Sequence, residues 1–353
     1  MNILYITVRS DFGGGPRHID QLVENLGKQY NIYIAAPVNE PYGIKWKQDL
    51  NVKAFFELPY RKLDFISLWE LRSFILRNNI TVVHSHGNGA GYYSRILKLV
   101  CPSIKIIHTF HGISDTYNSK IKKYIHLILG RFFKYFTDEF ILVSKGEYDL
   151  ALKRKFIKEQ HSQIIYNGIE TPNVTRDYDS NIFNIVTLSR FDYQKNMDYA
   201  FTIAERLKDY KDIYFTWVGD GNDYKRLKAA AQQNSLNIVF TGFQTEPMNF
   251  LIKSSLYLST SRFEGLPYAL IEAASIGLPI LATDVKGNNE VVKNEYNGYL
   301  FDNEEECVRL ILELYNDRQK LLRFSLNSKS FFKQHFTLNE MLEKLRTVYD
   351  RFD

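Results

Sequence analysis

The 353-residue sequence predicts an α/β protein with two doubly wound domains, and three observations lead to this prediction. The chain is long for a single hydrophobic core, so two domains of ordinary size fit it better. Short β-rich runs alternate with helical stretches, which is typical of parallel sheets covered by helices on both faces. The alternation begins again after a polar stretch at residues 171–181, so we expect one domain over residues 1–172 and a second over residues 173–336.

Each expected strand is a short apolar run that stops at polar residues or glycine. Functional sites in such sheets lie beyond the carboxyl ends of the strands, and in this sequence several glycines, histidines and charged residues follow those ends. Helical spacing is clearest at residues 18–30, 196–210 and 267–277. The expected strands are 2–8, 31–37, 81–86, 104–112 and 139–145 in the first half, and 183–190, 213–221, 237–243, 254–260 and 278–284 in the second.

The composition is that of a folded globular protein, with 45% apolar and 24% charged residues. The opening run at residues 1–8 is too short for the core of a signal peptide. No run approaches the ~18–20 apolar residues that a membrane-spanning helix needs. Two distant cysteines, Cys101 and Cys307, form no ligand pair and suit a reducing cytoplasm, so we expect a cytoplasmic protein.

The positive charge is unevenly distributed along the chain. Residues 1–170 contain 23 Lys and Arg against 15 Asp and Glu, a net charge of +8, and the rest contains 22 against 25, a net charge of −3. This asymmetry suits an anionic partner of the first half, either nucleic acid or a phospholipid surface, unless it is only an uneven scatter of solvated lysines. Because nucleic acid has no other feature in its favour, we do not predict a nucleic-acid partner.

Three glycines follow the first expected strand, in RSDFGGGPRH at residues 9–18. Pro16 suits the first position of a helix, and the free N–H groups there would attract a phosphate or carboxylate. The dinucleotide-binding fingerprint does not fit, because His18 replaces its third glycine. The alternative is a tight turn between strand and helix.

Four histidines stand at two strand ends: His84, His86, His108 and His111. A zinc site is disfavoured because no carboxylate or cysteine joins them at metal-ligand spacing. His111 precedes Gly112, where a ligand could approach the backbone closely, so we expect His111 to be a hydrogen-bond donor in the active site. The alternative is a structural histidine with satisfied hydrogen bonds.

Cations and carboxylates follow two strand ends of the second half. Arg190 and Lys195 lie on one loop and could clamp a diphosphate. In FEGLPYALIEAA, at residues 263–274, we expect Pro267 to start a helix, so Glu264 lies in the loop before it. The N–H groups around Gly265 would face an anion. Glu272, flanked by apolar residues, should be buried, and the vicinal hydroxyls of a ribose would satisfy both of its oxygens.

FEGLPYALIEA resembles the E-x7-E signature of the retaining glycosyltransferases of family 4, which have the GT-B fold. The resemblance runs nearly end to end and implies two Rossmann-like domains facing across a cleft, with the final helix, near residues 337–353, packing back on the first domain. The pieces that carry it, besides the signature, are FGGGPRH, HTFHG, IIYNGIE, SRFDYQKN, VGDG, FTGF, GLPILATDVKGNNEVV and NGYLF.

The family resemblance implies a role for each candidate residue. The second domain would bind the donor: Arg190 and Lys195 the diphosphate, Glu264 the hydroxyls of the donor sugar, Gly265, Leu266 and Pro267 the phosphates, Glu272 the ribose, and Gly242 and Phe243 the base. The first domain would place Gly14 and Gly15 near the phosphate and acceptor, and His111 near the donor sugar. GNNEVV replaces the Gly-Gly-x-x-Glu turn of many relatives, which leaves the contact at residues 287–290 open. Asp220 receives no catalytic role.

The implied activity is retaining transfer of a hexose or N-acetylhexosamine from a nucleotide sugar, with UDP favoured. The acceptor would be a lipid-linked sugar or an oligosaccharide in the synthesis of capsule, O-antigen or exopolysaccharide. Arg190, Lys195 and the helix start would stabilise the departing phosphate, so we expect no metal or other cofactor to be required. DYD at residues 177–179 resembles a metal-binding DxD but lies in the linker. The alternatives are a sugar-nucleotide epimerase or hydrolase on the same scaffold, and a non-catalytic protein that binds glycan or nucleotide.

Residues 118–136 predict a helix with a basic stripe and an apolar stripe. Such a helix could rest on an anionic membrane surface and reach a lipid-linked acceptor. The alternative is an ordinary packed helix with solvated lysines. We expect peripheral attachment to the inner face of the cell membrane.

Overall fold

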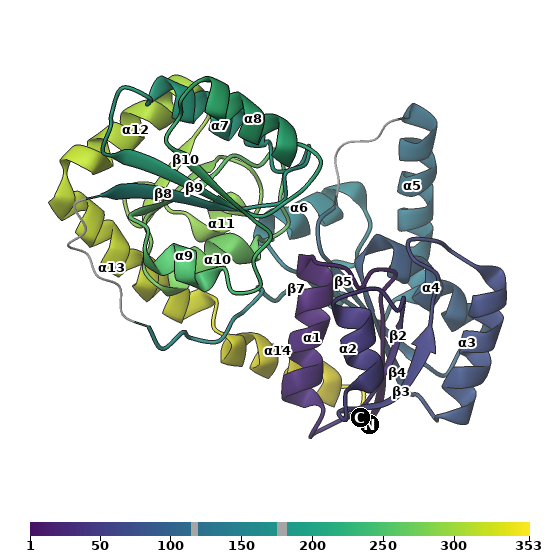
Figure 1. Ribbon diagram of the computed structural model, residues 1–353. Coiled ribbons are helices and arrows are strands. Elements are labelled where there is room, and N and C mark those ends of the chain that lie inside the picture. Colours follow the sequence, from purple (N-terminus) through teal and green to yellow (C-terminus); the bar gives the residue numbers. More distant parts are fainter. Residues whose placement is uncertain (114–118, 175–181) are drawn as a thin grey trace. The chain divides into compact units, whose positions relative to one another are not determined.

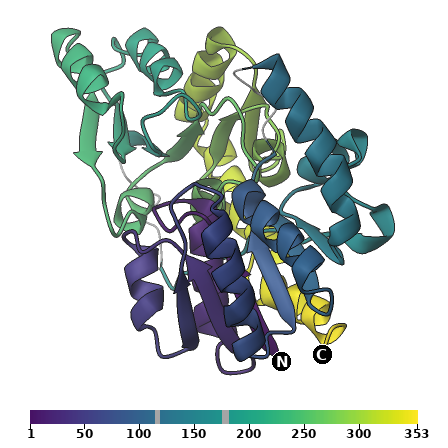
Figure 2. The same ribbon diagram turned by 90° about the vertical axis from the view of Figure 1, so that its right-hand side faces the viewer.

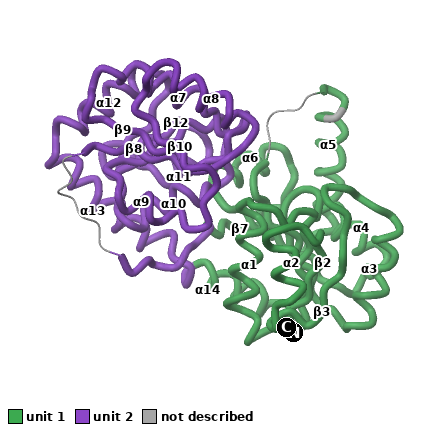
Figure 3. Tube along the Cα trace, in the orientation of Figure 1, with its two compact units in different colours: residues 1–166, 341–353 green, residues 167–340 purple. Residues whose placement is uncertain are grey.

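The computed structural model describes residues 1–113, 119–174 and 182–353, and it divides into two compact units. Unit 1 comprises Met1–Tyr166 and Met341–Asp353, and unit 2 comprises Asn167–Glu340 (Figure 3). The boundary between Tyr166 and Asn167 lies slightly before the one expected at 172/173.

Unit 1 contains a parallel sheet of seven strands in the order β3-β2-β1-β4-β5-β6-β7, and helices cover both of its faces (Figures 1 and 2). The edge strands β3 and β7 were not predicted, because their half-exposed residues form no continuous buried run. The strands are β1 (Asn2–Ile6), β2 (Asn31–Ala36), β3 (Val52–Glu57), β4 (Val82–His86), β5 (Lys105–Phe110), β6 (Glu139–Leu142) and β7 (Ser162–Ile164).

The alternation of side chains along β1 explains how the unit 1 helices are arranged. Leu4 and Ile6 point to one face, where they form a core with α3 and α4. Tyr5 points to the other face, where its hydroxyl accepts a hydrogen bond from Tyr349 of α14 at 3.3 Å. The helices are α1 (Gly14–Leu26), α2 (Tyr42–Gln48), α3 (Phe65–Arg77), α4 (Gly87–Val100), α5 (Lys120–Phe133), α6 (Lys145–Arg154) and α14 (Leu338–Asp350), with short 3₁₀ turns at Lys134–Phe136 and Glu159–His161.

Unit 2 repeats this architecture with six parallel strands in the order β10-β9-β8-β11-β12-β13. In Figure 1, α7, α8 and α12 lie on one face of this sheet, and α9, α10 and α13 lie on the other. The strands are β8 (Phe183–Leu188), β9 (Ile213–Val218), β10 (Ile238–Gly242), β11 (Leu256–Ser259), β12 (Ile280–Thr283) and β13 (Gly298–Phe301). The helices are α7 (Met197–Arg206), α8 (Tyr224–Gln233), α9 (Met248–Ile252), α10 (Tyr268–Ser275), α11 (Asn288–Val291), α12 (Glu304–Asn316) and α13 (Arg318–His335).

The prediction of two doubly wound parallel sheets is therefore confirmed. In each sheet the strand order reverses once, between β1 and β4 in unit 1 and between β8 and β11 in unit 2. Ligands of such sheets bind at the carboxyl ends of the two strands that flank the reversal. Among the described helices, none combines the length and the apolar character needed to cross a bilayer.

Close backbone packing joins the ends of β8 and β9. Gly219 follows β9 with φ +135°, and a Cβ atom there would lie 1.9 Å from the carbonyl oxygen of Ser189. The N–H of Ser189 in turn donates to the carbonyl of Val218 at 2.9 Å. Only glycine fits such a position, because both the conformation and the approach exclude a side chain.

Gly219→Ala should lower the free energy of unfolding by roughly 3 kcal/mol, through backbone strain and collision with Ser189. Gly242→Ala is the matched control, because Gly242 also has a positive φ, +73°, but its Cβ would have no neighbour closer than 3.8 Å. It should cost only about 1 kcal/mol. Urea unfolding followed by circular dichroism would measure both, and equal losses would contradict the role of close packing.

Candidate functional site

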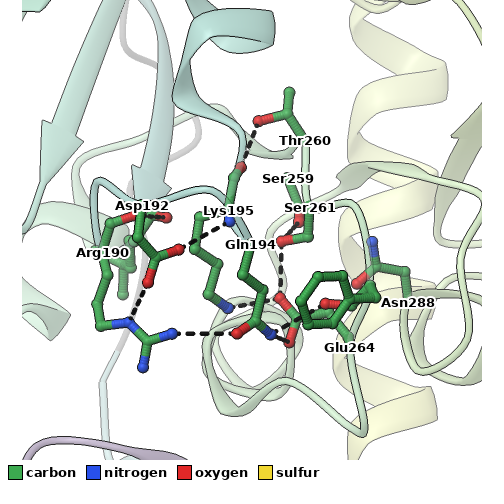
Figure 4. Close-up of polar contacts among 12 residues, drawn as sticks. Arg190, Asp192, Gln194, Lys195, Ser259, Thr260, Ser261, Glu264 and Asn288 are labelled. Carbon is green, nitrogen blue, oxygen red and sulfur yellow. Dashed lines mark hydrogen bonds and ion pairs between the residues drawn. The ribbon is translucent and has the colours of Figure 1, made fainter. Parts of the chain in front are cut away.

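The loops after β8 and β11 meet at an ion pair between Lys195 and Glu264 (Figure 4). Lys195 Nζ lies 2.5 Å from Glu264 Oε1, and the Glu264 side chain is only 7% exposed. Ser261 Oγ donates to the same carboxylate oxygen at 2.7 Å. Because β8 and β11 are neighbours at the reversal of strand order, the sheet itself brings these distant residues together.

Arg190, on the same loop as Lys195, joins this network through Gln194. Arg190 Nε donates to Asp192 Oδ2 at 2.8 Å, and Nη2 donates to Gln194 Oε1 at 3.1 Å. Gln194 Nε2 donates to the carbonyl of Phe263 at 3.0 Å and lies 3.3 Å from Glu264 Oε2. Both predicted cations are thus at the site, and each already pairs with a carboxylate.

The helix start after Glu264 differs by one residue from the prediction. Pro267 is the N-cap of α10 in an extended conformation, with φ −77° and ψ 120°, and Tyr268 is the first helical residue. The reason is that ψ of Pro267 is not helical, although its φ is. Within the described part of the chain, the N–H groups of Gly265 and Leu266 have no acceptor. The loop is held from the other side by Asn167, whose Nδ2 donates to the carbonyl of Leu266 at 3.0 Å.

The GNNEVV turn supports the same loop. Gly287 has φ +86°, and a Cβ atom there would lie 2.5 Å from the carbonyl oxygen of Gly265. Asn288 is fully buried, and its Nδ2 donates to the carbonyl of Thr283 at 3.0 Å. Thr283 Oγ1 donates to the carbonyl of Ser261 at 2.6 Å. The contact that the sequence left open is therefore a tight backbone contact with residues 264–265.

Glu272 and the segment at Gly242 occupy other parts of the same sheet edge. Glu272 lies inside α10 and is 8% exposed, which confirms the predicted burial. Gly242 ends β10, and its carbonyl accepts from the N–H of Gly219 at 2.9 Å. Phe243, which follows, is 48% exposed. An exposed aromatic ring at the edge where the strands end can stack on a planar ligand.

The strand ends of unit 1 bring Gly15, His86 and His111 together. His86 Nδ1 and His111 Nε2 are 3.1 Å apart, and a Cβ atom on Gly15 would lie 3.5 Å from His111 Cδ2. Burial lowers the pKa of His111 well below its usual value, and the neighbouring His18 and His84 lower it further. A neutral His111 has one donor and one acceptor nitrogen, so it could donate one hydrogen bond to an uncharged hydroxyl.

Glu147 fixes the backbone beside His111. Its Oε1 accepts from the N–H of Gly112 at 2.6 Å, and its own N–H donates to Ser144, the N-cap of α6, at 3.2 Å. Gly112 adopts φ +112°, a conformation that glycine enters readily. Sequence reasoning missed Glu147, although Ser-x-x-Glu at residues 144–147 is a recognisable capping signal.

His84 and His108 are structural. His84 bonds Tyr349 and Thr109, each at 2.7 Å, and His108 bonds Ser85 at 2.9 Å. In residues 1–113, 119–174 and 182–353, no three His, Cys, Asp or Glu side chains are arranged to hold a metal ion. The DYD motif at residues 177–179 lies outside the described residues.

The first helix also starts earlier than predicted. α1 begins at Gly14 with Gly13 as N-cap, so Pro16 is its third residue rather than its first. Pro16 still lies in the first turn, where a missing N–H removes no helical hydrogen bond. Because α1 begins at Gly14, the N–H groups of Gly14 and Gly15 lie at the amino end of the helix dipole. Gly14 is also exposed.

Comparisons with known proteins find related sequences over nearly the whole chain. Residues 12–172 match the family described as Glycosyltransferase Family 4, and residues 177–331 match the family described as Glycosyl transferases group 1. An uncharacterized glycosyltransferase of Methanocaldococcus jannaschii is 30% identical, over 96% of this chain and 94% of that protein.

Two proteins of Escherichia coli are also similar. The UDP-Gal:alpha-D-GlcNAc-diphosphoundecaprenol alpha-1,3-galactosyltransferase is 24% identical over 81% of this chain and 79% of that protein. The O-antigen biosynthesis glycosyltransferase WbnH is 25% identical over 92% of this chain and 94% of that protein. Among solved structures, Anabaena HepE in complex with UDP matches with a TM-score of 0.84 and 15% identity, covering 99% of this chain and 100% of that chain. This last likeness concerns the fold.

The buried histidines predict an acid-sensitive unit 1. The pKa values of His84, His86, His108 and His111 lie well below 6.5 in the folded state, chiefly because of burial. Below about pH 6.5 the unfolded chain therefore binds protons that the folded chain does not. The free energy of unfolding should therefore be at its full value above about pH 6.5. It should decrease as the pH is lowered further, by up to about 1.4 kcal/mol per pH unit for each histidine.

Urea unfolding at pH 7.5 and 5.5 would measure this loss. His111→Gln should reduce the difference between the two pH values, because it removes one titrating ring. His161→Gln is the control, since His161 is exposed, and it should leave the difference unchanged. A pH difference that is the same in His111→Gln and in the parent protein would contradict the assignment.

Proposed function

The chain belongs to the family 4 glycosyltransferases and has their GT-B fold, and on that premise we propose that it is a retaining enzyme of polysaccharide biosynthesis. It transfers a hexose or N-acetylhexosamine from a UDP-sugar to a lipid-linked or oligosaccharide acceptor. Relatives named for a UDP-galactose donor, a diphosphoundecaprenol-linked acceptor and O-antigen synthesis support this choice.

The network around Lys195 and Glu264 is the observation that carries the proposal. Two cations, a carboxylate and two N–H groups that have no acceptor among the described residues stand at the reversal of strand order in unit 2. A nucleoside diphosphate needs cations and N–H donors, and a sugar needs hydrogen-bond acceptors for its hydroxyls. Glu264 accepts from Lys195, Ser261 and Gln194, and its two oxygens keep capacity for a sugar hydroxyl.

In the proposed reaction the bond between the anomeric carbon and the diphosphate breaks, and negative charge grows on the leaving phosphate. Arg190, Lys195 and the N–H groups of Gly265 and Leu266 stabilise that charge from fixed positions. Pro267 completes the phosphate loop. The acceptor hydroxyl attacks from the side of the leaving group, the phosphate takes its proton, and no metal is required.

The remaining residues keep the roles that the family pattern implies. Glu272 binds the ribose, and Gly242 and Phe243 bind the base. In unit 1, Gly14 and Gly15 approach the phosphate and acceptor, and His111 donates to the donor sugar.

The rival activities gain no support. The relatives from Escherichia coli and Methanocaldococcus jannaschii are named glycosyltransferases, not epimerases or hydrolases. Incubation with UDP- and GDP-sugars in the absence of acceptor would expose either rival as rapid epimer formation or turnover. A protein that only binds nucleotide would instead show no transfer with any acceptor.

Helix α5 suits a membrane-bound acceptor. Residues 120–136 contain five Lys and Arg and no Asp or Glu, and Ile121 and Tyr124 are 72% and 68% exposed. Such a helix can lie in the interface of an anionic membrane. We propose peripheral attachment at the cytoplasmic face, where the nucleotide sugar is supplied.

Lys195→Ala and Glu264→Gln should each lower kcat/KM about 10²- to 10³-fold, because each removes a contact to the reacting group. Transfer of a radiolabelled sugar to a short-chain lipid-linked acceptor would measure the loss. The exposed residues Lys253 and Glu295 provide matched controls, and Lys253→Ala and Glu295→Gln should retain activity. Wild-type rates in Lys195→Ala would refute the assigned role, provided that thermal shift shows the variant folded.

The stereochemistry of the first product distinguishes the proposed mechanism from inversion. Proton NMR of product formed early in the reaction should show the anomeric configuration of the donor. The initial rate should be unchanged by EDTA, because the protein itself supplies the positive charge. An inverted product would refute retention, and loss of rate that Mg²⁺ or Mn²⁺ restores would refute metal independence.

A further inference from the structure

A second exposed apolar surface lies on unit 1, formed by the loop after β3 and the first turns of α3. We call residues 60–69 the α3 patch. Its large exposed side chains are Tyr60 (43% exposed), Leu63 (37%), Phe65 (72%), Ile66 (72%) and Trp69 (63%). Single exposed apolar residues are common, but a contiguous group of this kind marks an interaction surface.

Packing within unit 1 does not account for the patch. α3 already buries a separate stripe, Leu68, Leu71 and Ile75, against the sheet and α4. Phe65, Ile66 and Trp69 do not belong to that stripe and stay exposed. A helix with two apolar faces normally has a partner on each.

The patch is held firmly at the carboxyl edge of the unit 1 sheet. The N–H of Arg61 donates to the carbonyl of Val8 at 2.9 Å, and Tyr60 Oη donates to Asp11 Oδ2 at 3.2 Å. Both partners lie on the loop between β1 and α1, which leads to Gly14 and Gly15. Asp64 caps α3 by accepting from the N–H of Ser67 at 2.7 Å. The patch is therefore a fixed surface next to the strand ends that carry the proposed acceptor site.

Cations border the aromatic rings of the patch. The guanidinium of Arg61 lies 5.3 Å from the ring of Tyr60, and that of Arg72 lies 5.3 Å from the ring of Trp69. Lys62 adds an exposed positive charge. Aromatic rings with adjacent Arg and Lys are the combination that anchors proteins at the membrane–water interface.

Helix α5 begins at the same sheet edge, because α3 and α5 each follow a parallel strand of one sheet. α3 and α5 both lie beside α4: α3 shares its core, and Phe133 of α5 contacts Tyr92 of α4 with ring centres 5.6 Å apart. Figure 2 shows these helices on the same side of the unit 1 sheet. Two surfaces with the same chemistry thus stand on one side and one edge of the unit.

We propose that the α3 patch is a second membrane anchor, which inserts Phe65, Ile66 and Trp69 into the interface of an anionic bilayer while α5 lies on it. The proposal rests on the proposed function, because a lipid-linked acceptor resides in that bilayer. Contact through both elements fixes the orientation of unit 1, which α5 alone would leave free to rotate about its axis. The carboxyl edge with Gly15 and His111 then faces the membrane surface.

Trp69 provides a direct test without a label. The chain contains three tryptophans, and Trp46 and Trp217 are fully buried whereas Trp69 is exposed. Vesicles of phosphatidylcholine that contain ~30% anionic phosphatidylglycerol should shift the tryptophan emission of the protein to the blue, and brominated lipids should quench that emission. Pure phosphatidylcholine should do so far less, because the basic residues contribute attraction. Trp69→Phe should abolish the shift but retain binding.

Vesicle sedimentation then distinguishes the proposed anchor from nonspecific hydrophobic binding. The double variant Phe65→Ser/Trp69→Ser should bind vesicles at least about tenfold more weakly, because less apolar surface is transferred from water into the bilayer. Leu76→Ser is the matched control, because Leu76 is 51% exposed on the same helix but lies near its carboxyl end. It should bind like the parent protein.

Two outcomes would overturn the inference. Vesicle binding with unshifted Trp69 emission would mean that α5 docks alone. A concentration-dependent dimer in light scattering, with Trp69 shifted in the absence of lipid, would mean that the patch pairs two copies of the chain. Transfer to a water-soluble acceptor tests the proposed function separately: it should persist in the Phe65→Ser/Trp69→Ser variant, and its absence in the parent protein would count against the function itself.

Discussion

The contact between Lys195 and Glu264 is the interaction on which the rest of the unit 2 edge depends. A carboxylate that is 7% exposed needs a cation and hydrogen bonds, and Lys195, Ser261 and Gln194 supply them. Removing one partner of such a pair typically costs about 3–5 kcal/mol, because the other charge stays buried alone. The pair therefore fixes the loops after β8 and β11 before any ligand arrives, and preorganised charge of this kind is what a developing anion requires.

The backbone around this pair leaves the loop little freedom to move. Gly287 touches the carbonyl of Gly265 so closely that a side chain cannot enter, and Asn167 holds the next carbonyl. An incoming diphosphate would consequently find the N–H groups of Gly265 and Leu266 in place. Arg190 differs, since its side chain is 42% exposed: its Nε pairs with Asp192 on the same loop, and its Nη2 donates only to a neutral amide. It can turn to a phosphate at less cost than Lys195, which would have to be shared between Glu264 and the phosphate.

Local patterns in the sequence were sufficient for the strands β1, β2, β4, β5, β6 and β8 to β12, for the two sheets and for the burial of Glu272. They were insufficient for the edge strands β3 and β7, whose residues are half-exposed, and they also did not predict β13, a four-residue edge strand that is mostly buried. They also gave no sign of Gln194 and Ser261 as partners of Glu264. Both are ordinary polar loop residues, and Gln194 meets Glu264 70 positions away only because β8 and β11 pair. Periodicity defines which residues form strands, but the order of strands in a sheet determines which loops touch.

The net charge of each half of the chain does not predict where the cations of the candidate site lie. The first half carries the excess of Lys and Arg, but the side chains at its strand ends are histidines that burial keeps neutral. Its positive charge lies instead on outer elements such as α5, beside exposed apolar rings. The second half is faintly acidic overall, yet Arg190 and Lys195 stand at the reversal of its strand order. The local chemistry of a site depends on which side chains stand at the strand ends, where helix dipoles and neighbouring loops converge. The net charge of a whole domain describes only the surface that a large anionic partner would meet.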